Sequence, residues 1–318
     1  MLISERKHTT MNQGEYNVEP KENVYFGICL VISLILYAAM VVGVIALFET
    51  GKMDMIAAIA VYAIIILVAL HFLRGMLVGY IRGNAIKLGP HQFNDIHAIV
   101  MSQSQQLGIT RVPDVYMLQQ GGALNAFATR FMGTDFVVLY SDVMEAAYEE
   151  NLATVEFIIA HELGHIKRNH ILKRLVVLPA MLVPFLGKAY SRACEYTCDS
   201  IGASISQEGA RSGMLVLAAG TKLFQKVNVH QFTEQTHTES GFWLWFAEKV
   251  STHPHLAKRL ARFPETETVH RSSAAKAQDW KMPVVESTPT PAPAPTPTQE
   301  APKSEEPAGD DLSRFMPK

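Results

Sequence analysis

The chain has 318 residues, of which 48% are hydrophobic and only 18% are charged, and its formal net charge is −2. A soluble domain usually carries about a quarter charged residues, so these proportions exclude a single soluble globule. The near-zero charge excludes a large basic surface for nucleic acid, and three cysteines are too few for a disulfide-built secreted scaffold.

Two apolar runs near the start of the sequence account for the excess of hydrophobic residues. Residues 24–48 carry no charge and include 22 hydrophobic residues among 25, and residues 55–73 include 18 among 19. At about 1.5 Å per residue, each run is long enough as a helix for a hydrocarbon core of about 30 Å. We therefore expect a transmembrane hairpin, and not a signal peptide, because the first run is long and acidic residues precede it.

Basic residues flanking the two runs predict the orientation of the hairpin. Three lie before the first run and three after the second, whereas the connector has one. The positive-inside rule then places residues 1–23, both termini and everything after the hairpin in the cytoplasm. The residues concerned are Arg6, Lys7 and Lys21 before the hairpin, Lys52 in the connector, and Arg74, Arg82 and Lys87 after it.

Residues 74–280 are predicted to form an α+β domain that is mainly helical and has a small sheet. Hydrophobic periodicity favours helices at 92–106, 151–170 and 192–205, and short strands at 115–118, 124–131 and 136–140.

Two further segments of this region are ambiguous. The uncharged segment 175–187 contains two prolines and is too short to span a bilayer, so it either contacts the membrane or forms a buried, kinked helix. The aromatic run at 242–246 is expected to pack in the core, with docking at the membrane interface as the alternative.

The last segment, 281–318, has a different composition. It holds 9 of the 16 prolines and has four basic and six acidic residues, which gives it the whole net charge of the chain. Such a composition predicts a disordered, proline-rich tail, whose PxxP-like segments could recruit a partner of unknown identity.

The helix predicted at 151–170 contains the sequence His161-Glu162-Leu163-Gly164-His165. Two histidines four residues apart lie on one helix face, so both imidazoles can reach the same metal ion. A glutamate beside the first histidine is placed to take a proton from water. The motif therefore predicts a zinc-dependent hydrolase.

A third protein ligand is needed, and the sequence leaves more than one candidate. The metzincin extension fails, because it requires glycine and histidine where the chain has Arg168 and Ile171. Glu195 and Asp199 share a helix face, so one could ligate the metal while the other hydrogen-bonds the free nitrogen of a histidine. Cys194 and Cys198 flank Glu195 and leave a zinc–thiolate site as an alternative.

Four motifs in this order resemble the HtpX-like and CAAX prenyl protease family of membrane-bound zinc metallopeptidases. They are the sequence Asn125 to Ala128, HELGH, SRxxEYxxD and STHPHLAKR, and the resemblance covers roughly residues 90 to 265. It implies one zinc ion per chain, held by His161, His165 and Glu195.

The resemblance also implies roles for the other residues of these motifs. Glu162 would be the general base and Asp199 the supporting carboxylate. His253 would stabilise the tetrahedral oxyanion, with Arg259 as its companion. The strand formed by Asn125, Ala126, Phe127 and Ala128 would pair with the backbone of a peptide substrate.

One departure from the family pattern concerns the membrane segments. Family members often have a second pair of spans between HExxH and the third ligand, whereas here about thirty residues intervene. We therefore expect two spans, not four.

The sequence predicts a membrane-anchored zinc endopeptidase that cleaves membrane or misfolded proteins. Its expected partners are protein or peptide substrates and the lipid bilayer, with no nucleic acid, and its expected location is the bacterial cytoplasmic membrane. The alternatives are a prenyl-protein protease and a catalytically silent membrane scaffold.

Overall fold

The computed structural model describes residues 16–119, 126–149 and 152–263 of the chain. The chain divides into two units, Met1–Pro264 and Glu265–Lys318, and every described residue belongs to the first. The predicted tail at 281–318 therefore lies outside the described residues.

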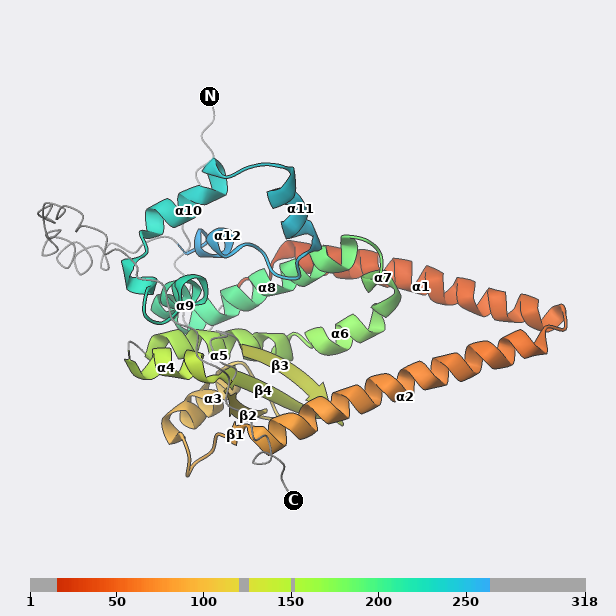
Figure 1. The fold of residues 1–318 in the computed structure, drawn as a ribbon, viewed down its shortest axis with the longest axis horizontal. Coiled ribbons are helices and arrows are strands. Elements are labelled where there is room, and N and C mark those ends of the chain that lie inside the picture. The colour runs from red at the N-terminus through yellow and green to blue at the C-terminus, as the bar shows by residue number, and fades with distance from the viewer. Residues whose placement is uncertain (1–15, 120–125, 150–151, 264–318) are drawn as a thin grey trace, which may run out of the picture. The chain divides into compact units, whose positions relative to one another are not determined.

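Two long apolar helices open the fold, α1 (Pro20–Glu49) and α2 (Met53–Asn84), and a short turn joins them (Figure 1). Their most apolar windows have mean hydropathies of 2.9 and 2.8, and only 11% and 0% of those windows is buried. The core helix of a soluble protein would be mostly buried, whereas these two windows are almost wholly exposed. Both predicted spans are confirmed as helices long and apolar enough to cross a membrane.

Both helices are longer than their apolar runs. The end of each helix that lies away from the connecting turn belongs to the folded body. Val78 and Ile81 of α2 are buried in one cluster with residues of the sheet, and Cys29 of α1 is buried beside Tyr190. Glu22, in the first turn of α1, is fully buried as well. Hydropathy alone detects the apolar stretch of each helix and does not show which of its residues the folded body buries.

A small mixed sheet follows the hairpin. Its strands are β1 (Ile86–Lys87), β2 (Asp114–Leu118), β3 (Ala126–Phe131) and β4 (Thr134–Tyr140), in the order β1-β2-β4-β3. β2 and β4 run parallel, and β3 pairs with β4 antiparallel. The turn between β3 and β4 has φ values of 48° at Met132 and 77° at Gly133, the left-handed conformations of a tight hairpin turn. β4 is largely buried, whereas β3 is half-buried and lies at the edge.

The remaining elements are helical. They are α3 (Asn94–Gln106), α4 (Ser141–Glu149), α5 (Leu152–Lys167), α6 (His170–Val176), α7 (Leu178–Met181), α8 (Leu186–Ile205), α9 (Gln207–Ala219), η1 (Phe224–Lys226), α10 (Val229–Thr238), α11 (Phe242–Val250) and α12 (Leu256–Leu260). Central among them is α5, which packs against α8, α9 and the sheet and is buried on almost every side. This confirms the predicted fold class, a mainly helical α+β domain with a small sheet, preceded by an apolar hairpin.

Two ambiguous segments are now placed. The segment 175–187 is kinked as predicted, with α6, α7 and the start of α8 in succession, but much of it is exposed, including Leu182 at 81%. The preferred interpretation of 242–246 as core was wrong, because Trp243 and Trp245 on α11 are 77% and 50% exposed. An aromatic run alone does not reveal whether protein or lipid covers it.

Close packing of α5 against α9 depends on glycine, and we expect Gly209→Ala to destabilise the fold. A methyl group at Gly209 would collide with the backbone carbonyl of Ala153, which cannot rotate away. Overpacking of this kind costs about 1–3 kcal/mol or more. Thermal unfolding in detergent should show a lowered midpoint, whereas Gly83→Ala, where the new methyl meets open space within α2, should not lower the midpoint.

Candidate metal centre

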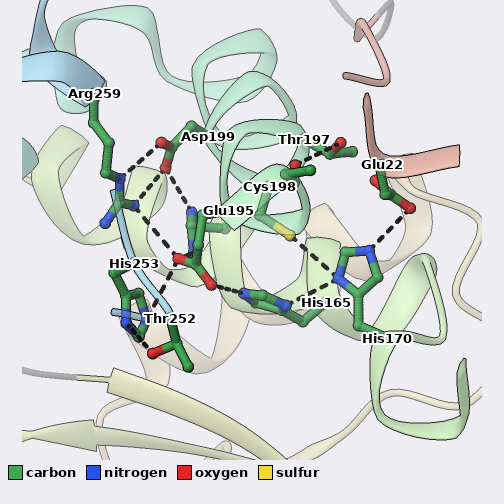
Figure 2. A network of polar contacts seen from close by, with 12 residues as sticks. Glu22, His165, His170, Glu195, Thr197, Cys198, Asp199, Thr252, His253 and Arg259 are labelled. Carbon is green, nitrogen blue, oxygen red and sulfur yellow. Dashed lines mark hydrogen bonds and ion pairs between the residues drawn. The ribbon is translucent and has the colours of Figure 1, made fainter. Parts of the chain in front are cut away.

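The HExxH motif on α5 faces a carboxylate on α8, so the two helices bring the predicted metal ligands together (Figure 2). Nε2 of His161 lies 3.4 Å from Oε2 of Glu195, and Nε2 of His165 lies 3.4 Å from Oε1 of the same carboxylate. The exposed fractions of the three side chains are 13% or less, so water does not compete strongly for these groups.

This set of donors fits a zinc ion in spacing and in charge. Nitrogen and oxygen ligands lie about 2.0–2.2 Å from tetrahedral zinc, which puts two ligand atoms about 3.4 Å apart. Burial lowers the pKa of His161, but the carboxylates of Asp199 and Glu195 outweigh burial and raise this pKa to about 10. Burial likewise opposes ionisation of Glu195, yet the two histidines hold its pKa well below the usual range. The pocket thus favours a positive charge beside an ionised carboxylate.

Asp199 lies one helical turn after Glu195 and contacts His161 from the other side of the ring. Its Oδ1 is 2.9 Å from Nδ1 of His161, which leaves Nε2 of that histidine facing Glu195. Arg259 of α12 holds Asp199 in turn, because its Nε donates to Oδ2 at 2.8 Å and its Nη2 donates to Oδ1 at 2.6 Å. Burial would raise the pKa of Asp199, but the charge of Arg259 holds it below its ordinary value.

His253 lies beside the candidate ligands on the solvent side. Its Nε2 is 3.5 Å from Oε2 of Glu195, its side chain is 61% exposed, and its Nδ1 shares a hydrogen bond of 3.0 Å with Thr252. His253 lies in the loop between α11 and α12, which begins at Leu256.

Arg192 fixes the segment that carries His253, and the sequence analysis missed this contribution. From α8, its Nη1 donates to three backbone carbonyl oxygens at 2.8–3.0 Å, those of Glu248, Lys249 and Ser251. These contacts also satisfy carbonyl groups at the end of α11. The signal was present in the motif SRxxEYxxD, where a buried arginine precedes the candidate ligand by three residues.

The other predicted site residues are placed as follows. Glu162 is 7% exposed on α5, directly after His161. Ala126, Phe127 and Ala128 lie in the edge strand β3, against which α5 also packs. Asn125 lies outside the described residues.

Cys198 is the competing candidate for the third ligand. One donor atom each from His161, His165 and Cys198 lie within 4.8 Å of one another. Burial, however, raises the pKa of the Cys198 thiol well above its ordinary value, as it does for Cys194. Both carboxylate oxygens of Glu195, by contrast, each face Nε2 of one histidine at 3.4 Å, so the geometry favours Glu195 over Cys198.

A second polar cluster adjoins the first and was missed in the sequence. His170, at the start of α6, contacts His165 on one side and Glu22 of α1 on the other. The sequence indication for His170 was a third histidine five residues after His165, just beyond the HExxH motif. Glu22 is one of the acidic residues that precede the first apolar run, and no local pattern relates it to His170.

Removing the Arg259 guanidinium should destabilise this buried arrangement, because the Asp199 carboxylate would lose both hydrogen bonds from Arg259 and keep only its contact with His161 in the interior. For Arg259→Met we expect a loss of about 3–5 kcal/mol, the usual effect of breaking a buried ion pair at one partner. Thermal unfolding in detergent measures this loss. The double variant Arg259→Met with Asp199→Leu should recover part of it; no recovery would contradict the ion-pair explanation.

Taken together, two histidines and a glutamate of an HExxH helix, faced by a carboxylate from a second helix, define a metallopeptidase of the HExxH type. The chain belongs to peptidase family M48, whose family model matches residues 90–186 and 175–267. The family expected from the four sequence motifs is thereby confirmed.

Two similar proteins are informative about the extent of this likeness. The plastoglobule-localized metallopeptidase 48, chloroplastic, of Arabidopsis thaliana is 26% identical over 175 residues, which are 49% of this chain and 49% of that protein. The chain thus spans about half the length of this curated relative. The crystal structure of S. mikatae Ste24p matches 79% of this chain and 68% of its own, with a TM-score of 0.41 and 13% identity.

Proposed function

We propose that the chain is a membrane-anchored zinc endopeptidase that hydrolyses peptide bonds of membrane or misfolded proteins. The observation that carries this proposal is the convergence of His161, His165 and Glu195, with both His–Glu separations at 3.4 Å. In the proposal these three side chains hold one zinc ion. Zinc so held acts as a Lewis acid and makes water a nucleophile near neutral pH.

Glu162 is the proposed general base. Its carboxylate takes the proton from the attacking water and delivers it to the nitrogen of the leaving amine as the peptide bond breaks. Its position next to His161 on α5 supports this role, because the rigid helix holds base and ligand at a fixed separation.

His253 and Arg259 have different roles in the proposed mechanism. His253 is exposed and lies beside Glu195, so its ring can donate a hydrogen bond to the oxyanion that develops on the substrate carbonyl. Arg259 is buried and engaged with both oxygens of Asp199, which supports a positioning role: it holds Asp199 against His161.

The substrate is proposed to bind as an added strand at the edge of the sheet. β3 lies at that edge and packs against α5, and it contains Ala126, Phe127 and Ala128. Backbone pairing there would present an extended peptide irrespective of its side chains, as suits an enzyme that accepts unfolded proteins.

The decisive experiment for the proposed function uses the full chain purified in detergent. We expect about one zinc ion per chain and cleavage of an unfolded soluble protein that stops after metal removal and resumes with added zinc. Zinc-free protein that cleaves equally well would overturn the proposal. Protein with neither zinc nor activity would favour the scaffold, and cleavage confined to prenylated peptides would favour the prenyl-protein protease.

We further propose that the catalytic domain faces the cytoplasm of a bacterial cell. The distribution of Lys and Arg around α1 and α2 supports this orientation. A reporter fused after residue 280 should be active only in the cytoplasm, and activity on the opposite side would reverse the assignment.

A further inference from the structure

We propose that Glu22 and His170 are positioning residues for the metal ligand His165, and that they connect the first membrane helix to the metal centre. The inference rests on the proposed function, since it takes His165 to be a ligand. It adds a route by which α1 contributes to the zinc site and is not only an anchor.

The three side chains form a continuous line of contacts (Figure 2). Oε1 of Glu22 lies 3.2 Å from Nε2 of His170, and Nδ1 of His170 lies 3.0 Å from Nδ1 of His165. Nε2 of His165 in turn lies 3.4 Å from Glu195. Glu22 and His170 are 0% and 1% exposed, so solvent does not replace these contacts.

When His165 ligates a metal, only one arrangement of protons makes both the His165–His170 and the His170–Glu22 contact a hydrogen bond. Its Nε2 is then unprotonated, and the neutral ring carries its proton on Nδ1. That N–H donates to Nδ1 of His170, which therefore accepts and carries its own proton on Nε2. The Nε2–H donates to the Glu22 carboxylate. Glu22 thus selects the tautomer of His170, and His170 selects that of His165.

The charge of Glu22 is held in place from the other side. Arg168 donates to the same Oε1 through Nη2 at 2.9 Å, and Nζ of Lys173 lies 3.4 Å from it. A fully buried carboxylate persists only when it is paired in this way. Two cations on Glu22 also disfavour a second metal at the group Glu22, His170 and Cys194, whose donor atoms lie within 4.8 Å of one another.

The experiment compares zinc affinity by chelator competition in full-length wild type and His170→Phe. We expect affinity to fall about 10–100-fold, as for other partners of ligating histidines, and the visible spectrum of the cobalt-substituted protein to change. His230→Phe, the same exchange at a histidine of α10 whose side chain is 84% exposed, should match wild type in both. His170→Phe with wild-type zinc affinity and an unchanged cobalt spectrum would overturn the inference.

A second measurement does not depend on whether the variant folds. In zinc-loaded wild type labelled with ¹⁵N-histidine, Nδ1 of His170 should be unprotonated and its Nε2 protonated; the opposite tautomer would overturn the proposal. These outcomes are separable from failure of the proposed function. Wild type that binds no zinc refutes the function itself, whereas zinc-bound wild type with the wrong tautomer refutes the positioning role alone.

An independent observation points to a further membrane contact, made by α7, α11 and the turn before α8. We infer that this apolar surface lies in the interfacial layer of the bilayer. Its residues are exposed although apolar or aromatic, and the turn before α8 meets α11 through Phe185, whose ring centroid is 6.4 Å from that of Trp245. The exposed residues are Leu178, Leu182, Phe185, Phe242, Trp243, Leu244 and Trp245.

The continuity of this surface with α1 identifies lipid as its occupant. The backbone N–H of Ala180 donates to Ser33 at 3.2 Å, and the Tyr37 hydroxyl donates to the carbonyl of Val176 at 3.4 Å. Ser33 is the last buried residue of α1, and the exposed apolar stretch of this helix begins directly after it. The segment around α7 therefore lies beside the membrane-facing part of α1 (Figure 1).

Tryptophan fluorescence tests this contact directly. The chain has three tryptophans, and Trp280→Phe leaves only Trp243 and Trp245. In vesicles of phosphatidylcholine and phosphatidylglycerol, lipids brominated at shallow acyl positions should quench the emission, and aqueous acrylamide should quench it weakly. Emission unaffected by brominated lipid and fully quenched by acrylamide would overturn the inference.

Discussion

Glu162→Gln is expected to retain zinc and to lose hydrolysis of an unfolded protein, with kcat/KM lower by about 10²–10⁴-fold. Glutamine has nearly the shape of glutamate but cannot accept a proton from water at its amide, so the metal ligands keep their positions while the base is lost. Zinc content and the rate of peptide cleavage, measured on the same purified sample, give both numbers.

A matched control for this prediction is available on the same helix. Glu156→Gln removes the same charge from α5, but residue 156 lies six positions earlier and points away from the motif face. We expect its zinc content and cleavage rate to match wild type. Equal activity of Glu162→Gln and wild type would remove Glu162 from the mechanism and leave the zinc site without a base.

Replacing Glu195 should remove the metal, whereas replacing Cys198 should not. Glu195→Gln exchanges a charged oxygen donor for a weak neutral one, between two histidines that contact it at 3.4 Å. Loss of a residue that only supports a metal ligand typically lowers zinc affinity by about 10–100-fold. Loss of the ligand Glu195 itself should lower it further. Cys198→Ser keeps the size of the side chain and should retain wild-type affinity, because in the proposed site Glu195 and not the thiol faces Nε2 of both histidines.

The two variants together decide the identity of the third ligand. Chelator competition on wild type, Glu195→Gln and Cys198→Ser gives the three affinities under one condition. The reverse order, with tight binding in Glu195→Gln and weak binding in Cys198→Ser, would assign the third position to the thiolate and contradict the proposed site.

Local rules predicted much of this molecule from its sequence. Helical periodicity of four residues put His161 and His165 on one face, and the same spacing put Glu195 and Asp199 on another. The structure shows these two faces opposed. Neither spacing predicts that the two helices contact each other. That prediction came from the resemblance to a family.

The missed features depend on contacts between segments far apart in the chain. Glu22 and His170 are 148 residues apart, and no local pattern relates them. Arg192 likewise acts on the end of α11, 56 or more residues away. Exposure of Trp243 could not be read from composition, because an aromatic run suits a protein core and a membrane interface equally well.

X-ray absorption at the zinc edge of the purified wild-type protein tests the central claim most directly. We expect one zinc ion per chain with nitrogen and oxygen neighbours at about 2.0–2.2 Å, including two imidazoles, and no sulfur. A sulfur neighbour at about 2.3 Å would contradict the site built from His161, His165 and Glu195, and the absence of zinc from active protein would contradict the mechanism.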